Sequence, residues 1–333
     1  MNDFEFLEND FEFIGDKQDI HTDAVQPSKP FLKDVWERFK SNKGALIGAI
    51  LIIIIVLLAI VGPLIVPYVF DAVDVSQQSM APRVPLLENL GFMDGTGGIK
   101  EYTGQFADAY HYFGTDQLGR DLWVRVWEGT RISLFVAASA VIIDIFIGMV
   151  YGLVSGFFGG VVDNVMQRIQ EIINSIPTLV ILTLLLLVMT PSLYTIIIAL
   201  MITGWIGMAR ITRAQVLKIK EQEFVLASRT LGASDFFIIF KAILPNIFGQ
   251  LITMSMFSIP NAIFYEAFLA FVGLGIPAPQ ASLGSLINDG FNTVTTTPYM
   301  VVIPVIVLAI LMLSFNLMAD GLRDALDPTM KEM

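Results

Sequence analysis

Two acidic residues, Asp144 and Glu266, lie inside long stretches of apolar residues. A carboxylate in such a place can carry a proton, bind a cation or hold a polar partner. An acidic side chain in the middle of a bilayer costs roughly 2.5 to 3.5 kcal/mol, so it usually faces a bundle interior or a wet cavity. We predict that Glu266 and Asp144 line a polar path between helices. The alternative is that each packs against a polar partner.

The other residue types exclude several kinds of site. The sequence has no cysteine, and its two histidines, His21 and His111, lie in polar stretches. Disulfides, thiolate sites and histidine-based metal clusters are therefore not expected. The G-x-x-x-x-G-K-[ST] motif that cradles nucleotide phosphates is also absent from the sequence. We predict a chain with no catalytic residue, no metal site, no cofactor of its own and no nucleic-acid partner.

The elements that must position the two carboxylates are membrane-spanning helices. The chain is 55% hydrophobic and 15% charged, whereas a soluble domain carries about a quarter charged residues. About 20 apolar residues cross the hydrocarbon core. Six spans are predicted, at about 46–66, 132–157, two within the uncharged stretch 172–209 with a division at 190–192, 245–272 and 298–319. Lipid requires each span to satisfy its own backbone, so the fold class is all-α, a polytopic membrane protein.

The distribution of Lys and Arg predicts the orientation of these spans. Thirteen of these residues fall in segments that share one side with the N-terminus. Five others, from Arg83 to Arg131, fall in the long segment after the first span. Because basic residues are enriched on the cytoplasmic side, both termini are predicted to be cytoplasmic. Arg210 and Arg213, at the inner end of the fourth span, are interpreted as anchors at the membrane interface.

The predicted organisation has five parts. They are an acidic tail at 1–32, an N-terminal helix with the first span at 33–70, an extracellular loop at 71–131, a core at 132–320 that contains a cytoplasmic loop at 214–244, and a cytoplasmic C-terminal tail at 321–333. The acidic tail lacks helical or strand periodicity, which favours a disordered segment, and an acidic-aromatic docking segment is the alternative. Glycines at 148, 152 and 156 predict close helix packing along the second span.

The basic cytoplasmic loop contains an amphipathic pattern. Phe224, Ala227 and Leu231 recur at three- and four-residue spacing, and Gly232 follows where a helix would stop. Ser234 is placed to cap a second short helix that leads into the fifth span. A short helix held outside the membrane between two spans suits a groove on a partner protein. A connector that lies on the membrane surface is the alternative.

The same loop resembles a known motif. Residues 224–232 read FVLASRTLG, and Pro245 follows thirteen residues after the glycine. This pattern resembles the "EAA loop" of ABC importer permeases, whose helices dock on the ATPase subunits. The resemblance implies ATPase-coupling residues Phe224, Ala227, Ser228, Arg229, Leu231, Gly232 and Pro245. The sequence departs from the motif where its glutamate and second alanine are replaced by Leu226 and Ser228.

Further stretches resemble the C subunit of oligopeptide and dipeptide permeases, a family that also contains nickel permeases. Residues 113–121 read FGTDQLGRD, 129–134 GTRISL, 266–275 EAFLAFVGLG, 283–287 LGSLI and 320–328 DGLRDALDP. The resemblance implies a type I ABC importer permease (MetI-like) fold in a bacterial inner membrane. The implied contacts with an extracellular solute-binding protein are Thr115, Asp116, Gly119, Arg120 and Asp121.

The implied assembly has a second, homologous permease and two cytoplasmic ATPases that bind ATP and Mg. Its substrate would be a peptide, and nickel or another small solute is the alternative. Two other classes of function remain to be tested. A proton-coupled secondary transporter would use Asp144 and Glu266 as proton carriers and would need no ATP. An intramembrane hydrolase would use the same pair as a dyad. Asp144 has a further alternative, which is pairing with the companion permease.

Overall fold

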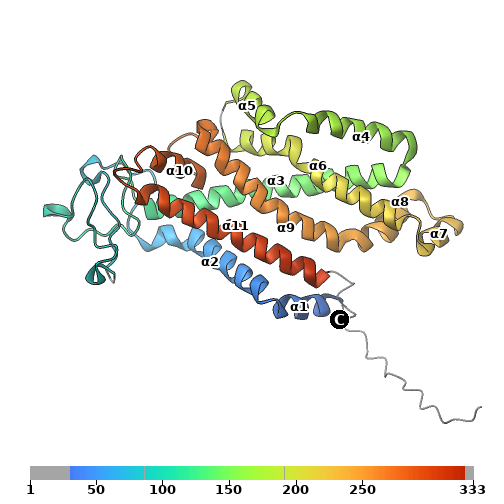
Figure 1. Cartoon of the computed structure of the whole chain (residues 1–333), viewed down its shortest axis with the longest axis horizontal. Coiled ribbons are helices and arrows are strands. Elements are labelled where there is room, and N and C mark those ends of the chain that lie inside the picture. Colours follow the sequence, from blue (N-terminus) through green and yellow to red (C-terminus); the bar gives the residue numbers. More distant parts are fainter. Residues whose placement is uncertain (1–30, 86, 191, 327–333) are drawn as a thin grey trace, which may run out of the picture.

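The structure is a computed structural model that describes residues 31–326, apart from 86 and 191. The predicted acidic tail, up to residue 30, and the last seven residues, 327–333, lie outside this part of the chain. In the described part, long helices run side by side along one axis (Figure 1). The segment after the first span sits at one end of this bundle, and the short helices of the basic loop sit at the other.

The helices account for most of the described chain. They are α1 (Phe31–Ser41), α2 (Lys43–Ile65), α3 (Leu122–Phe158), α4 (Gly160–Ser175), α5 (Thr178–Val188), α6 (Leu193–Ile219), α7 (Glu223–Thr230), α8 (Asp235–Phe237), α9 (Leu244–Leu269), α10 (Leu283–Phe291) and α11 (Tyr299–Leu326). A π-helical segment, Ile238–Ile243, precedes α9, and a second one, Ala270–Leu274, follows it. Such segments often mark functional sites in helices.

Among the described residues, five helices are long and apolar enough to cross a membrane, namely α2, α3, α6, the continuous stretch around α9, and α11. The third predicted span is different, because it is a pair of helices, α4 and α5, bent by 77°. Pro177 causes the break, since the residue before a proline is pushed out of helical geometry. Ile176 accordingly has φ −90° and ψ 126°. Counted as one span, the pair brings the total to six.

Two predicted boundaries need correction. The second span begins at Leu122, about ten residues before the predicted start, because the Asp121 side chain accepts from the Val124 N–H at 2.9 Å and caps the helix there. The last ten residues of the predicted loop, 122–131, are therefore helical. The sixth helix continues to Leu326, so residues 321–326 are helical and do not belong to a tail.

Close packing of α3 on α6 forms the centre of the bundle. A Cβ placed at Gly148 would lie 2.6 Å from the Trp205 carbonyl oxygen, and one at Gly152 would lie 2.5 Å from the Ala209 carbonyl oxygen. Gly156 faces Val216 in the same way, with 2.8 Å from a built Cβ to the Val216 Cβ. The small-residue face predicted from the sequence is confirmed at these three positions.

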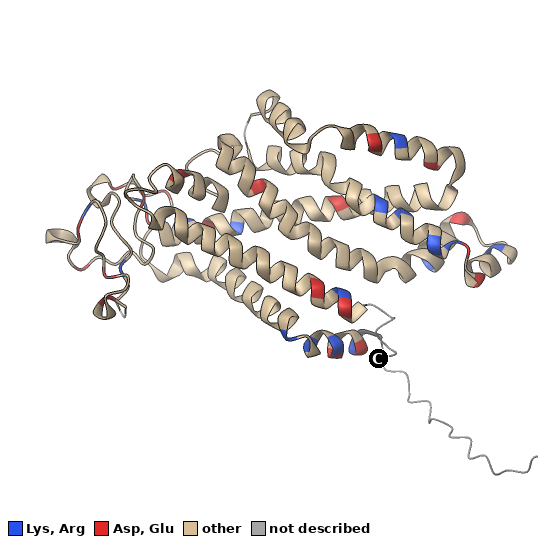
Figure 2. Cartoon of the chain, viewed as in Figure 1, with Lys and Arg blue, Asp and Glu red and all other residues tan. Residues whose placement is uncertain are grey.

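Charged residues gather at the two ends of the bundle (Figure 2). Between the ends, large apolar side chains remain exposed on the outer surface, and Ile53, Leu57 and Leu64 of α2 are 58%, 54% and 80% exposed. Exposed aliphatic side chains over this length fit a lipid environment. The two ends of the described part of the chain, α1 and the last turn of α11, lie close together, and Asn42 donates to the Asp324 carboxylate at 3.2 Å.

Candidate functional site

The short helix α7 stands at the end of the bundle and is attached to it by one side. Val225 is fully buried there and belongs to a cluster with Phe157 of α3 and Val216 of α6. The other side of α7 exposes apolar groups. Phe224 is 41%, Leu226 46% and Leu231 87% exposed. Exposed apolar side chains on a helix outside the lipid-facing length of the bundle mark a surface that a partner can cover.

The end of α7 has the geometry that the sequence predicted. Gly232 has φ +80°, and its N–H donates to the Arg229 carbonyl at 3.0 Å. The next N–H, of Ala233, reaches back to the Ser228 carbonyl at 3.1 Å. These two bonds form a Schellman motif, which places a left-handed residue directly after the helix. Ser234 then caps the following helix by accepting from the Phe237 N–H at 3.3 Å.

Polar contacts join the three helices α3, α4 and α6 beneath α7. The Arg213 guanidinium of α6 donates twice to Asp163 of α4, at 2.7 and 2.6 Å. Ser155 of α3 also donates to Asp163, at 2.5 Å. The Lys220 ammonium donates to the Gly156 carbonyl at 3.0 Å. Arg213 is therefore one half of an ion pair between helices, a pairing that the interpretation as an interface anchor missed. These contacts hold α3, α4 and α6 together beneath α7, and α7 itself is attached to them through Val225.

Arg229 of α7 points back to the bundle, with its guanidinium carbon 5.7 Å from the centre of the Phe157 ring. A cation this close to an aromatic face is attracted to it. Of the predicted coupling residues, Arg229 therefore contributes to attachment. Ala227 is exposed on α7 and Ser228 is half-buried, and Pro245 occupies the first turn of α9.

The five predicted binding-protein contacts fold the extracellular loop instead of forming its surface. Thr115, Asp116 and Asp121 are 0%, 4% and 3% exposed. Gly119 has φ +75° and backs onto the Asp74 carbonyl, where no side chain would fit. Arg120 turns inward to donate to Asp116 at 2.7 Å. Burial is the physical reason to correct the prediction for these side chains.

Three large apolar residues are exposed on the surface of that loop. Leu90, Phe92 and Ile99 are 78%, 61% and 59% exposed. Their types gave no signal in the sequence, because a lone apolar residue in a turn-rich segment fits the core of the loop equally well. A partner that meets this end of the bundle contacts these residues first.

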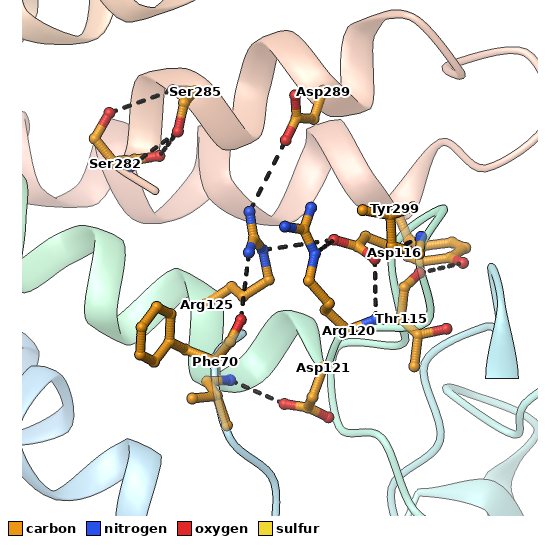
Figure 3. Close-up of polar contacts among 12 residues, drawn as sticks. Phe70, Thr115, Asp116, Arg120, Asp121, Arg125, Ser282, Ser285, Asp289 and Tyr299 are labelled. Carbon is orange, nitrogen blue, oxygen red and sulfur yellow. Dashed lines mark hydrogen bonds and ion pairs between the residues drawn. The ribbon is translucent and has the colours of Figure 1, made fainter. Parts of the chain in front are cut away.

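Asp116 is the centre of a network that joins the loop to the helices (Figure 3). Its Oδ1 accepts from the Leu118 and Arg120 N–H groups at 2.9 Å each. Its Oδ2 lies 3.5 Å from the Arg125 Nε of α3. Arg125 in turn lies 4.0 Å from Asp289 of α10. The network connects the loop with α3 and α10, and the sequence could not have paired residues so far apart.

We expect Asp116→Ala to loosen the loop, because it leaves two backbone N–H groups and two guanidinium groups without their shared acceptor. Breaking a buried pair in this way costs about 3–5 kcal/mol. Limited proteolysis of the membrane-embedded protein measures the effect as faster cleavage between 71 and 121. Glu101→Ala, an exposed acidic residue of the same loop, is the matched control. Equal cleavage of both variants would contradict the role of Asp116.

His111 and Tyr102 fill the interior of the loop. The His111 ring nitrogens lie 2.7 Å from Asp121 Oδ2 and 2.7 Å from Gln77 Oε1. Tyr102 donates to the Ala81 carbonyl at 2.7 Å. Burial raises the pKa of Tyr102 far above its usual value, so its hydroxyl keeps this proton. Both side chains therefore stabilise the fold of the loop.

Glu266 lies at the junction of three helices and faces no cavity. Its side chain is fully buried, and Oε2 accepts from the Ser133 hydroxyl of α3 at 2.7 Å. The Leu283 N–H at the start of α10 donates to the same hydroxyl at 3.4 Å. The prediction that Glu266 lines the path is wrong for this conformation. The alternative, packing with a polar partner, describes its place between α3, α9 and α10.

We expect Glu266→Gln to keep the stability of the protein, because the amide oxygen still accepts from Ser133. Glu266→Ala leaves the hydroxyl without this acceptor and opens a void, at a cost of about 2–4 kcal/mol. The thermal unfolding midpoint of the purified protein in detergent measures both changes. A Gln variant as unstable as the Ala variant would show that the negative charge itself is required.

Asp144 lies on the wall of a cavity of about 370 Å³ in the middle of the bundle. Helices α3, α4, α5, α6 and α9 line it, and it opens to the surface of the chain, where the lining residues Asn174, Gly204 and Asn261 are exposed. Asp144 is 7% exposed, and its Oδ1 has no hydrogen-bond partner among the described residues. Asp144 therefore lines a cavity, and its role as a path residue stays a prediction. Asp144 and Glu266 contact different surroundings, so the structure does not bring them together as a dyad.

The sequence of the chain matches known families over most of its length. Residues 148–332 match the family described as "Binding-protein-dependent transport system inner membrane component". The chain belongs to this family. Residues 30–82 of the permease also match the "N-terminal TM domain of oligopeptide transport permease C". The all-α, MetI-like permease fold predicted from the sequence is thereby confirmed, and the chain is a multi-pass protein of the bacterial inner membrane.

Curated relatives cover almost the whole permease. The oligopeptide transport system permease protein OppC of Bacillus subtilis is 42% identical over 93% of this chain and 94% of its own length. The dipeptide transport system permease protein DppC of the same organism is 40% identical over 96% and 92%. OppC of Escherichia coli is 36% identical over 89% and 90%.

Solved structures are similar at a greater distance. An inward-facing MetNI methionine ABC transporter chain has a TM-score of 0.46 and 20% identity, covering 60% of this chain and 94% of that one. An amino acid ABC transporter with histidines has a TM-score of 0.47 and 19% identity, covering 59% and 91%.

Proposed function

We propose that the permease imports peptides as one of two transmembrane subunits in an ATP-driven complex, and that α7 couples it to the ATPases. The observation that carries the coupling role is α7 itself. It exposes Phe224, Leu226 and Leu231 at the end of the bundle, while an ion pair and a hydrogen bond join the helices beneath it. The peptide substrate is supported by relatives named as oligopeptide and dipeptide permeases that match more than nine tenths of the chain.

The remaining parts of the complex follow from this assignment. A homologous permease completes the translocation path, and two cytoplasmic ATPases bind ATP and Mg, so this chain holds no cofactor. The end of the bundle that carries α7 and both termini faces the cytoplasm. A solute-binding protein meets the opposite end, where the contacts shift from the buried Asp116 region to exposed Leu90, Phe92 and Ile99.

The mechanism is alternating access driven by the ATPases. Closure of their ATP-bound dimer pushes on α7, and the push reaches α3 and α6 through Val225, which packs with Phe157 and Val216. The ion pair of Arg213 with Asp163 links α6 to α4. The helices around the central cavity then tilt and open it toward the binding protein. Hydrolysis reverses the movement and opens the cavity to the cytoplasm. Small shifts produce such switches because packed helices move as units.

Purification of the permease from its native membrane, followed by identification of bound proteins, tests the assembly. We expect a second permease, one or two ATPases and a solute-binding protein. Reconstitution of that complex in vesicles then tests the substrate by uptake of a labelled tripeptide with and without ATP. Uptake of nickel in place of peptide supports the alternative substrate. Uptake that does not depend on ATP and that a protonophore abolishes supports a secondary transporter.

A further inference from the structure

The central cavity has one charged residue among those that line it. The polar residues around Asp144 are Asn174, Thr178, Thr203, Ser258, Asn261 and Tyr265. None of the described lining residues is Lys, Arg or His. A carboxylate that is 93% buried usually has a cationic or hydrogen-bonding partner, because isolated burial of a charge is costly. Asp144 forms no ion pair with another described residue, which leaves its carboxylate available to a cation from outside the described chain.

The lining favours one kind of partner. A hard metal ion needs about six oxygen ligands, whereas the cavity offers a single carboxylate beside apolar and aromatic groups. Phe257 and Tyr265 of α9 line the same space. A carboxylate combined with aromatic rings is the arrangement that suits an organic ammonium group, which gains from both the charge and the ring faces.

Gly204 of α6 keeps the carboxylate at the wall. A Cβ built on Gly204 would collide with Asp144, with only 2.6 Å to both Cγ and Oδ1. Even alanine at 204 would therefore push the carboxylate away from its place. Because Gly204 has no side chain, the Asp144 carboxylate fits at the wall of the cavity. A substitution of Gly204 therefore displaces this carboxylate without removing its charge.

The size of the cavity sets how much of a substrate it holds. About 370 Å³ lies at the lower end of the range for small-molecule sites. This volume fits the terminal residue of a peptide, not a whole oligopeptide. The break between α4 and α5 adds polar groups, since Asn174 and Thr178 flank it and both line the cavity. Substrate sites in transporters are commonly built at broken helices.

We infer that Asp144 forms a subsite for the α-ammonium group of a peptide within the translocation path. This inference rests on the proposed peptide transport and goes further by assigning the group that the permease binds. The free amino terminus is the one cation common to unmodified peptides of any sequence. A single carboxylate can thus hold every such substrate without selecting its side chains, and Phe257 and Tyr265 cover the ammonium from the α9 side.

The test uses the purified complex of the permease with its partner subunits, without the binding protein, so that the selectivity of that protein plays no part. Calorimetry measures the binding of trialanine amide, trialanine and N-acetyltrialanine, which carry a cation, both charges and an anion. We expect the native complex to bind the amide at least tenfold more tightly than the acetylated peptide. Asp144→Asn removes this difference, and Gly204→Ala reduces it because the carboxylate is displaced.

Asp320→Asn, which removes an exposed carboxylate from α11, is the matched control and retains the native difference. The subsite is overturned if the native complex binds the three peptides equally or binds none of them. It is also overturned if Asp144→Asn keeps the preference, or if that variant loses the second permease, which would place Asp144 at the subunit interface. ATP-driven trialanine uptake by the native complex with its binding protein tests the proposed function separately.

Discussion

Replacement of Gly232 with valine is expected to lower ATP-driven peptide uptake about tenfold or more, with the chain still inserted in the membrane. Gly232 has φ +80°, a conformation that costs a β-branched residue about 1–3 kcal/mol. The strain falls on the Schellman motif that ends α7. The variant therefore no longer holds the exposed side chains of Phe224 and Leu231 in a fixed arrangement. Vesicle uptake and the amount of ATPase that co-purifies with the variant measure the loss.

Two further variants separate coupling from general strain. Gly232→Asn tolerates the left-handed conformation better and is expected to retain most of the uptake. Gly91→Val places the same strain at φ +69° in the extracellular loop, and neither glycine has a neighbour within 4 Å of a built Cβ. We expect Gly91→Val to keep the ATPases bound. Normal uptake by Gly232→Val would count against the docking role of α7.

The α7 region could be predicted in detail because its signals are local. Apolar spacing, the glycine at the helix end and the cap at Ser234 act within a few residues of each other, and the structure confirms all three. The long helices could be predicted for the same reason, since hydrophobic length alone defines a span. The break at Pro177 was also present in the sequence. It was missed because residues 190–192 already divided the uncharged stretch.

The environment of the polar residues could not be predicted, because it depends on contacts between distant segments. Glu266 and Asp144 both lie in apolar stretches of the sequence. In the structure, however, Glu266 accepts a hydrogen bond from Ser133, whereas Asp144 lines a cavity. The ion pair of Arg213 with Asp163 joins residues fifty positions apart. The same limit explains the extracellular loop, where the FGTDQLGRD stretch turned out to be its interior. A recognisable motif identifies a family, but burial decides what each of its side chains contacts.

The packing of α3 on α6 links the cavity to the coupling helix. Along α3, Asp144 faces Gly204, Gly152 faces Thr212, and the Gly156 carbonyl accepts from Lys220. The pair of α3 and α6 therefore carries Asp144, the carboxylate inferred to bind the substrate, near its middle and α7 at its end. Helices that are packed this closely move together instead of bending separately. A movement of this pair therefore carries Asp144 and Gly204 with it.

Replacement of Gly152 with leucine is accordingly expected to prevent recovery of a folded complex, and Gly152→Ala to destabilise it measurably. A single Cβ at 152 would lie 2.5 Å from both the Ala209 carbonyl oxygen and the Thr212 Cβ, and 2.9 Å from the Arg213 nitrogen. Overpacking of this kind costs about 1–3 kcal/mol for small additions. Larger side chains force the two helices apart and break the ion pair of Arg213. The thermal midpoint and size-exclusion profile of the detergent-purified complex measure both effects.

Gly249→Ala is the matched control, because it adds the same methyl group to a membrane-spanning helix where the nearest atom, on Leu326, is 3.6 Å away. We expect the midpoint of this variant to stay close to that of the native complex. If Gly152→Ala and Gly249→Ala had equal midpoints, the close contact of α3 with α6 would not be what holds the bundle together. If Gly152→Ala alone lost both stability and uptake, the path from α7 to the cavity would run through this contact.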